Sequence, residues 1–134
     1  MIIKQISIFL ENKPGRISDV TRLLAEKRID IQALNLVSSG DFGMLRLLVN
    51  DVEKVVRLLS DEHFAVVKTD VIRIVVPNKS GSLDKVLNVL AQEQTSIDYM
   101  YAFQYNNKAY AVIRPQDMNA CLNAMSKLPD EDKI

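Results

Sequence analysis

The chain has 134 residues, of which 48% are hydrophobic, a content that supports a packed core and excludes an intrinsically disordered chain. Its 17 basic residues balance its 17 acidic residues, so no overall charge attracts nucleic acid or an anionic membrane surface. A single cysteine rules out an intrachain disulfide framework, and no apolar stretch is long enough for a secretory signal or a membrane span, so we expect a cytoplasmic protein.

The first half of the chain begins with a predicted strand, a turn and a helix. Apolar and polar residues alternate up to Leu10, as in a strand with one buried face. A turn over residues 11–15 follows, and it contains Pro14 and Gly15, two residue types that are typical of turns. Apolar side chains at helical spacing over residues 17–24 then predict a helix with one buried face.

The first half continues with a second strand over residues 30–38, a glycine-containing hairpin turn and a third strand. A second helix carries apolar side chains at the i, i+3, i+4 and i+7 positions over residues 52–59. A residue suited to capping its N-terminus, Asn50 or Asp51, precedes it. A fourth strand is predicted over residues 64–68.

The same pattern recurs 66 residues later without a gap. Strand, turn, helix, hairpin and second helix follow in the same order from Val71 to Leu128. The apolar positions repeat in phase with each predicted element, which indicates two copies of one structural unit. Identical residues under this shift include Ile6/Ile72, Ile8/Ile74, Asn12/Asn78, Lys13/Lys79, Gly15/Gly81, Val20/Val86, Leu24/Leu90, Ala25/Ala91 and Ile31/Ile97.

The second copy has no predicted counterpart of the fourth strand. Residues 128–133 are mostly acidic and contain Pro129, so we expect a frayed end there. The strand over residues 71–76 then lacks its expected neighbour. We expect this strand either to be an open edge or to pair with another chain.

The order strand-helix-strand-strand-helix-strand predicts an antiparallel sheet with both helices on one face, a ferredoxin-like α+β fold. We therefore expect two βαββαβ modules, over residues 1–69 and 70–134, the second without a clear final strand. By strand alternation the helix-free face is apolar, with Phe9 and Met44 in the first copy and Tyr110 in the second. Such a surface predicts sheet-to-sheet packing or dimerisation, or else cover of one copy by the other.

Both copies place a glycine, Gly15 or Gly81, at the end of a turn that opens directly into a helix. The first N–H groups of a helix have no helical acceptor, and the helix dipole favours an anion there. Asn12 and Asn78 each carry a donor and an acceptor, which suits a ligand with both an ammonium and a carboxylate. These turns are candidates for binding a carboxylate or a phosphate, but all these residue types are also common in turns that bind nothing.

The sequence around the two turns resembles the ACT domain family. The first strand ends in E-N-K-P-G-R-I, an amphipathic helix follows, and R-I-D-I begins the next strand; P-N-K-S-G-S-L and T-S-I-D repeat the pattern. The chain, over about residues 3–127, therefore resembles a tandem ACT-domain protein. The resemblance implies modules that bind free amino acids and regulate metabolic enzymes or transcription, with sites where two modules pair side by side.

The resemblance also implies particular ligand-binding residues. They are Asn12, Lys13, Pro14, Gly15, Arg16 and Asp30 in the first copy, and Asn78, Lys79, Gly81 and Ser96 in the second. Leu10 and Val76 stand where some amino-acid-binding members have a polar side chain, and Asp30 stands where asparagine is frequent, so the identity of the amino acid stays open. Ser80 replaces the turn proline in the second copy, and we therefore expect the first copy to hold the better-formed site.

No catalytic residue, metal ligand or cofactor site is predicted. His63 is the only histidine and has no metal-binding partner at a suitable spacing, and Cys121 falls on the buried face of a predicted helix. The βαββαβ order is shared with RNA-recognition modules, but Met44 and Leu47 stand where those modules place stacking aromatic residues. We expect neither an enzyme nor a protein that binds nucleic acid.

The sequence thus predicts a non-catalytic regulatory protein that binds a free amino acid and signals through association, as a homodimer or with a metabolic enzyme. Two alternatives stay open. One is a regulatory subunit of a single amino-acid biosynthetic enzyme. The other is a structural interaction module whose sheet face is the function and whose turns bind nothing.

Overall fold

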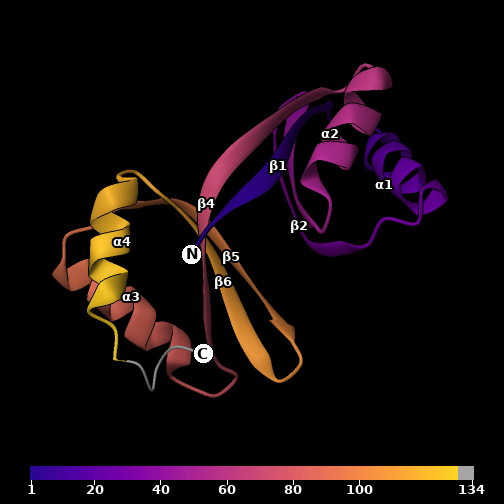
Figure 1. The fold of residues 1–134 in the computed structure, drawn as a ribbon. Coiled ribbons are helices and arrows are strands. Elements are labelled where there is room, and N and C mark those ends of the chain that lie inside the picture. The colour runs from indigo at the N-terminus through magenta and orange to yellow at the C-terminus, as the bar shows by residue number, and fades with distance from the viewer. Residues whose placement is uncertain (130–134) are drawn as a thin grey trace. The chain divides into compact units, whose positions relative to one another are not determined.

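The computed structural model describes residues 1–129, which form six strands and four helices (Figure 1). In chain order these are β1 (Ile2–Glu11), α1 (Arg16–Glu26), β2 (Ile31–Ser39), β3 (Phe42–Val49), α2 (Val52–Asp61), β4 (Ala65–Pro77), α3 (Ser82–Gln92), β5 (Ile97–Tyr105), β6 (Lys108–Pro115) and α4 (Met118–Ser126). The predicted order of elements is confirmed. The expectation of a frayed end lies, from residue 130 onward, outside the described residues.

The chain folds into two compact units. The first unit comprises Lys4–Thr69, and the second comprises Met1–Ile3 together with the chain from Asp70 onward. In each unit two helices, α1 with α2 or α3 with α4, pack against each other on one face of antiparallel strands (Figure 1). This is the predicted ferredoxin-like α+β arrangement.

The first unit orders its strands β2-β3-β1-β4, and β4 contributes its first residues to it. Alternation along each strand sends every second side chain toward the helices, and the register places Ile8 of β1 opposite Leu45 of β3 on that face. The buried core between the strands and the helices consists of Ile6, Ile8, Leu10, Val20, Leu24, Leu45, Leu47, Val49, Val55 and Leu59.

The second unit repeats this arrangement with β4, β6 and β5. The later part of β4 pairs with β6, where Ile74 lies opposite Ala111, and β6 pairs with β5. Its core consists of Ile72, Ile74, Val76, Val86, Leu90, Ile113, Cys121, Ala124 and Leu128. Equivalent positions of the two copies, such as Leu24 and Leu90, are therefore buried in equivalent places.

The strand next to β4 in the second unit comes from the start of the same chain. The N–H of Arg73 donates to the carbonyl of Met1 at 2.9 Å, and the Met1 ammonium donates to the carbonyl of Arg73 at 3.3 Å. The expectation that this strand is an open edge or pairs with another chain is therefore wrong at this point. Because of this pairing, Met1–Ile3 belong to the second unit, although the next residue in the chain, Lys4, begins the first unit.

β4 is longer than either strand that the sequence predicted. Its 13 residues join the predicted strands over 64–68 and 71–76 without a break. The connecting residues, Thr69 and Asp70, stay extended, and the Thr69 hydroxyl lies 3.1 Å from the hydroxyl of Ser7 on β1. β-branched residues dominate this stretch, which favours a continuous strand over a turn.

The two hairpins use two-residue turns. Gly40 and Asp41 connect β2 to β3, and Asn106 and Asn107 connect β5 to β6. Gly40, Asn106 and Asn107 all have positive φ, at 61°, 51° and 61°. Glycine and asparagine tolerate this conformation better than other residues, which explains their presence in tight hairpins.

The helix-free faces are partly buried and partly exposed. Leu48, Val71 and Val112 are fully or almost fully buried, although none of them belongs to a helix-side core. At the hairpin end of the first unit, Phe9 and Phe42 stay half exposed and stack on each other with ring centroids 5.0 Å apart. None of the helices in the described residues is long and apolar enough to span a membrane.

Candidate functional site

Both strand-turn-helix loops end in a glycine with the same unusual backbone. Gly15 has φ 87° and ψ −10°, and Gly81 has φ 89° and ψ −13°, which is the left-handed region. A side chain at either position is strained by this φ, although the space beside each Cα is open for 4 Å. Glycine is therefore the residue that fits best where each turn enters α1 or α3.

The four helices fall into two classes by the way they begin. Asp51 caps α2 by accepting the N–H of Lys54 at 3.1 Å, and Asp117 caps α4 by accepting the N–H of Ala120 at 3.0 Å. Within residues 1–129, no side chain caps α1 or α3. The N–H groups of their first residues, Arg16 and Ser82, donate to the carbonyls of Lys13 and Lys79 in the turns. The next N–H groups have no helical acceptor, which is the arrangement that binds a carboxylate or phosphate.

The first turn is attached to the neighbouring hairpin through Asn12. Its side-chain amide donates to the carbonyl of Gly40 at 3.1 Å, and its backbone N–H donates to the carbonyl of Asp41 at 2.8 Å. One of the two amide N–H donors of Asn12 is thus already in use. Within residues 1–129, no group donates to the amide oxygen of Asn12.

Lys13 folds back onto the end of β1. Its ammonium lies 2.8 Å from the carboxylate of Glu11, and both side chains are largely exposed. The hydrogen bond from Lys13, followed by its charge, lowers the pKa of the Glu11 carboxyl. Pro14 is exposed in the turn. This ion pair is a surface pair in high dielectric and contributes little to stability.

Arg16 is the first residue of α1 and is only partly exposed. Its guanidinium lies 3.1 Å from the carboxylate of Asp19 and 5.0 Å from the centre of the Phe64 ring. Asp19 also pairs with Arg22 at 3.1 Å. The helix dipole disfavours a cation at a helix N-terminus. The contacts of the Arg16 guanidinium with Asp19 and Phe64 therefore stabilise it there. The Nε of Arg16 is buried and has no hydrogen-bond partner among residues 1–129.

The second turn holds its side chains differently. Within the described residues, the Asn78 side chain makes no hydrogen bond, and Lys79 is exposed. The residue that occupies the position of Arg16 is Ser82, which is only 5% exposed. Its hydroxyl has no hydrogen-bond partner in the described part of the chain.

Asp30 and Ser96 do not lie beside the turns of their own modules. Asp30 immediately precedes β2, whose first residue pairs with Val49 at one end of β3. The first turn follows Glu11, which pairs with Phe42 at the other end of β3. Ser96 is placed in the same way, beside Gln116 and away from the second turn. The structure thus brings together the turn residues of each copy and separates Asp30 and Ser96 from them.

The other candidate groups have structural surroundings. His63 has a positive φ of 68° directly after α2, where its N–H donates to the carbonyl of Ser60 and closes the helix. Cys121 is fully buried in the second core, and burial raises the pKa of its thiol. In residues 1–129, no group of three or more histidine, cysteine or acidic side chains is placed to hold a metal ion.

Three features of the turns were not predicted from the sequence. They are the unpartnered hydroxyl of Ser82, the ring of Phe64 beneath Arg16, and the Gly40 carbonyl that accepts from Asn12. Only Ser82 could have been noticed in the sequence, because it follows Gly81 at the position where Arg16 follows Gly15. The other two depend on contacts between distant parts of the chain.

The comparison with known proteins agrees with this architecture. A family model described as an ACT domain pair matches residues 1–126. A crystal structure of a protein from Bacteroides thetaiotaomicron is 47% identical, with a TM-score of 0.87, over 95% of this chain and 88% of that one. Among proteins of curated function, none matches the chain.

More distant structures share the fold alone. The regulatory subunit of aspartate kinase from Thermus thermophilus superposes with a TM-score of 0.63 at 14% identity, over 96% of this chain and 97% of that one. The corresponding subunit from Thermus flavus gives a TM-score of 0.59 at 15% identity, over 96% and 95%. Together with the family match over nearly the whole chain, these findings confirm the resemblance noted in the sequence: the protein belongs to the family of ACT domain pairs.

Proposed function

We propose that this protein is a non-catalytic regulator that binds a free amino acid at its strand-turn-helix loops and passes on the occupancy of these sites through association. The observation that carries the proposal is the pair of uncapped helix starts behind Gly15 and Gly81. The other two helices of the same molecule are capped by aspartates. An α-carboxylate would complete α1 or α3 in the way that Asp51 and Asp117 complete α2 and α4.

The expected affinity follows from the number of hydrogen bonds. A hydrogen bond to a charged group contributes about 1.5–3 kcal/mol, and two of them contribute roughly 3–6 kcal/mol. The helix dipole adds about 0.3–1 kcal/mol for a carboxylate at an exposed helix start. The sum corresponds to dissociation constants from roughly millimolar to micromolar, which is suited to sensing a metabolite in a cell.

The exposed edge of the first unit favours association with a second copy of the same chain. β2 is the outermost strand of that unit, and its residues Ile31–Ser39 include neither a charged residue nor a proline. Leu34 and Val37 on this strand are 45% and 51% exposed. Edge strands of this kind pair readily with another strand, because nothing on them prevents it.

Such a pairing would also explain the position of Asp30. If β2 of one copy runs antiparallel to β2 of another, the start of one strand lies beside the end of the other. Asp30 of one copy would then lie at the end of the sheet where the other copy has its first turn. A homodimer could thereby assemble a site from residues that one chain keeps apart.

The test is a thermal-shift screen of the purified protein against the twenty L-amino acids. An amino acid present at about one hundred times its dissociation constant should stabilise the protein by roughly 2.7 kcal/mol. Light scattering with and without that amino acid then measures whether occupancy changes the mass of the assembly. A ligand with a roughly millimolar dissociation constant still adds about 1.4 kcal/mol at ten times that constant. If none of the twenty raises the melting temperature at concentrations up to about ten times a millimolar dissociation constant, the amino-acid proposal is wrong.

One alternative function has an observation of its own. The stacked Phe9 and Phe42 leave an exposed apolar surface on the helix-free face of the first unit, as expected for an interaction module that binds no ligand. Replacing both with serine should then abolish self-association, while no amino acid changes the melting temperature. An amino-acid shift that survives both substitutions favours the regulator instead.

A further inference from the structure

The two turns share one backbone conformation but differ in what their side chains do. We infer that the second turn, over residues 77–82, is the working ligand site and that the Ser82 hydroxyl hydrogen-bonds the carboxylate of the bound amino acid. The inference deepens the proposed function and rests on it. It also reverses the expectation, based on Pro14 and Ser80, that the first copy holds the better-formed site.

The first observation is the state of Ser82. The residue is only 5% exposed, and its Oγ makes no hydrogen bond within residues 1–129. Buried hydroxyl groups in folded proteins almost always have a partner, and one without a partner indicates a missing water, ion or ligand. A carboxylate oxygen is a good acceptor for this hydroxyl.

The position of Ser82 directs this hydroxyl toward the helix start. Ser82 is the first residue of α3, directly after Gly81. The Cα–Cβ bond of a helical residue tilts toward the helix N-terminus, so the hydroxyl lies at the end where the unsatisfied amides are. The first helical bond of α3 runs from the N–H of Lys85 to the carbonyl of Gly81, and the N–H groups of Leu83 and Asp84 precede it.

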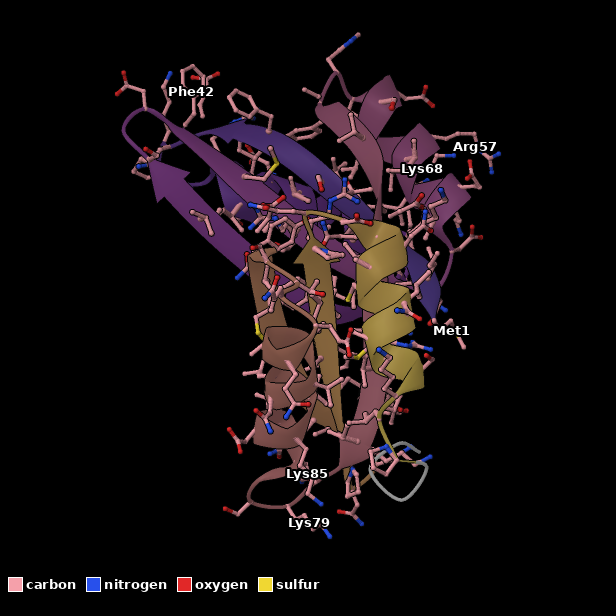
Figure 2. All side chains as sticks on the ribbon, turned by 90° about the vertical axis from the view of Figure 1, so that its left-hand side faces the viewer. Met1, Phe42, Arg57, Lys68, Lys79 and Lys85 are labelled. Atoms are coloured by element: carbon pink, nitrogen blue, oxygen red, sulfur yellow. The ribbon has the colours of Figure 1, made fainter. Side chains whose placement is uncertain are left out.

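The surroundings of the second turn favour an anion. Lys79 lies in the turn and Lys85 lies in the first part of α3, both at the same end of the helix (Figure 2). Within the described residues the Asn78 amide makes no hydrogen bond, so it can meet the polar groups of a ligand. A carboxylate at this place would find a hydroxyl, backbone amides and the exposed ammonium of Lys79.

The first turn uses the equivalent groups internally. The Asn12 amide donates to Gly40, and the Arg16 guanidinium pairs with Asp19 over the Phe64 ring. A ligand there would have to displace these contacts before it gained its own. The first turn is therefore the weaker of the two sites, even though Gly15 and Gly81 have the same φ.

The experiment is calorimetric titration of the full chain with each of the twenty L-amino acids and, for any that binds, with its carboxamide. We expect one amino acid bound per chain in the concentration range of the titration. The carboxamide should not bind, because it lacks the charge that the helix start stabilises. Ser82→Ala should weaken binding roughly tenfold to a hundredfold, as expected for the loss of one hydrogen bond to a charged carboxylate.

The stability of the ligand-free variant separates a ligand contact from a structural one. Ser82→Ala removes a buried hydroxyl that has no partner within residues 1–129, so its melting temperature without ligand should stay the same or rise. Thr95→Val is the matched control, because the Thr95 hydroxyl is also buried without a partner in the described part of the chain but lies after the opposite end of α3. This variant should bind with the affinity of the unmodified protein.

Gly81→Val and Gly15→Val form a second matched pair. Both substitutions place a β-branched residue at nearly the same φ with open space around it, so both cost similar stability. Gly81→Val should abolish binding and Gly15→Val should preserve it. The reverse result, or unchanged affinity in Ser82→Ala, overturns the inference while the proposed function stands. If no amino acid binds the unmodified protein, the proposed function fails, and the inference fails with it.

Discussion

The two units of this protein are built to the same plan but obtain their strands differently. The first unit closes with the beginning of β4, which follows α2 directly in the chain. The second unit has no strand after α4 in the described residues, and Met1–Ile3 at the start of β1 lies beside its β4 at Arg73 instead. β1 and β4 each therefore contribute to both units. Within residues 1–129, the start of the chain thus supplies a neighbour for β4 where the second copy has no strand after α4.

The turns add a second lesson to this comparison. Gly15 and Gly81 have almost identical backbone angles, and the helices after them begin in the same way. The polar groups have diverged around this fixed backbone, so that one turn is attached to its hairpin through Asn12 and the other carries the unpartnered Ser82. Backbone geometry is set by glycine and by the core, and it leaves the side chains free to change.

The largest expected effect comes from matched substitutions in the two cores. Leu24→Ala in the first unit and Leu90→Ala in the second should each reduce the free energy of unfolding by about 2–5 kcal/mol, because each leaves a cavity in a closely packed site. Since β1 and β4 run through both units, we expect one cooperative transition in each variant. Urea denaturation followed by circular dichroism measures both quantities.

Tyrosine fluorescence makes this test specific to one unit. All four tyrosines lie in β5 and β6 of the second unit. Leu24→Ala should therefore shift the tyrosine transition to lower urea by the same amount as the circular dichroism transition. Labelling of Cys121 gives an independent reading, because its buried thiol, whose pKa burial raises, reacts only when the second core opens. A tyrosine transition that does not move in Leu24→Ala would show that the units unfold independently.

A smaller effect is expected at the two capped helices. Asp51→Ala and Asp117→Ala each remove the side-chain acceptor of one N–H group and should cost about 1 kcal/mol, within a range of roughly 0.5–2 kcal/mol. Asn at either position keeps an acceptor and should recover most of the loss. Chemical denaturation of the four variants measures this. Equal losses in both units would support equivalent helices, whereas a loss confined to one unit would contradict it.

The sequence was sufficient for features that depend on local chemistry. The alternation of Ile6, Ile8 and Leu10 predicted a strand with one buried face, and these three side chains are buried in the first core. The choice between Asn50 and Asp51 as helix cap could not be made from residue type, because both are good caps; the structure selects Asp51. Turn glycines and capping acids affect only the backbone next to them, so their positions in the sequence are enough to predict turns and helix starts.

The sequence was insufficient where distant segments meet. The pairing of Met1 with Arg73 joins residues 72 positions apart, and no periodicity indicates it. The separation of Asp30 from its own turn follows from the register of β2 and β3, which a resemblance to a family does not give. Whether the Ser82 hydroxyl is buried and has a partner depends on how distant parts of the chain pack around it. These contacts arise from tertiary structure, which overrides what each residue indicates alone.

The smallest expected effect separates the two turns without any ligand. Asn12→Ala removes the hydrogen bond to the Gly40 carbonyl and should cost about 0.5–1 kcal/mol, as an exposed hydrogen bond does. Asn78→Ala removes no hydrogen bond within the described residues and should leave stability within about 0.5 kcal/mol of the unmodified protein. Asn12→Asp is the control, because a carboxylate has no donor for Gly40 and should lose as much as alanine. Equal losses for Asn12→Ala and Asn78→Ala, measured by denaturation, would mean that both turns are held by their own side chains, and the distinction on which the choice of the second turn depends would disappear.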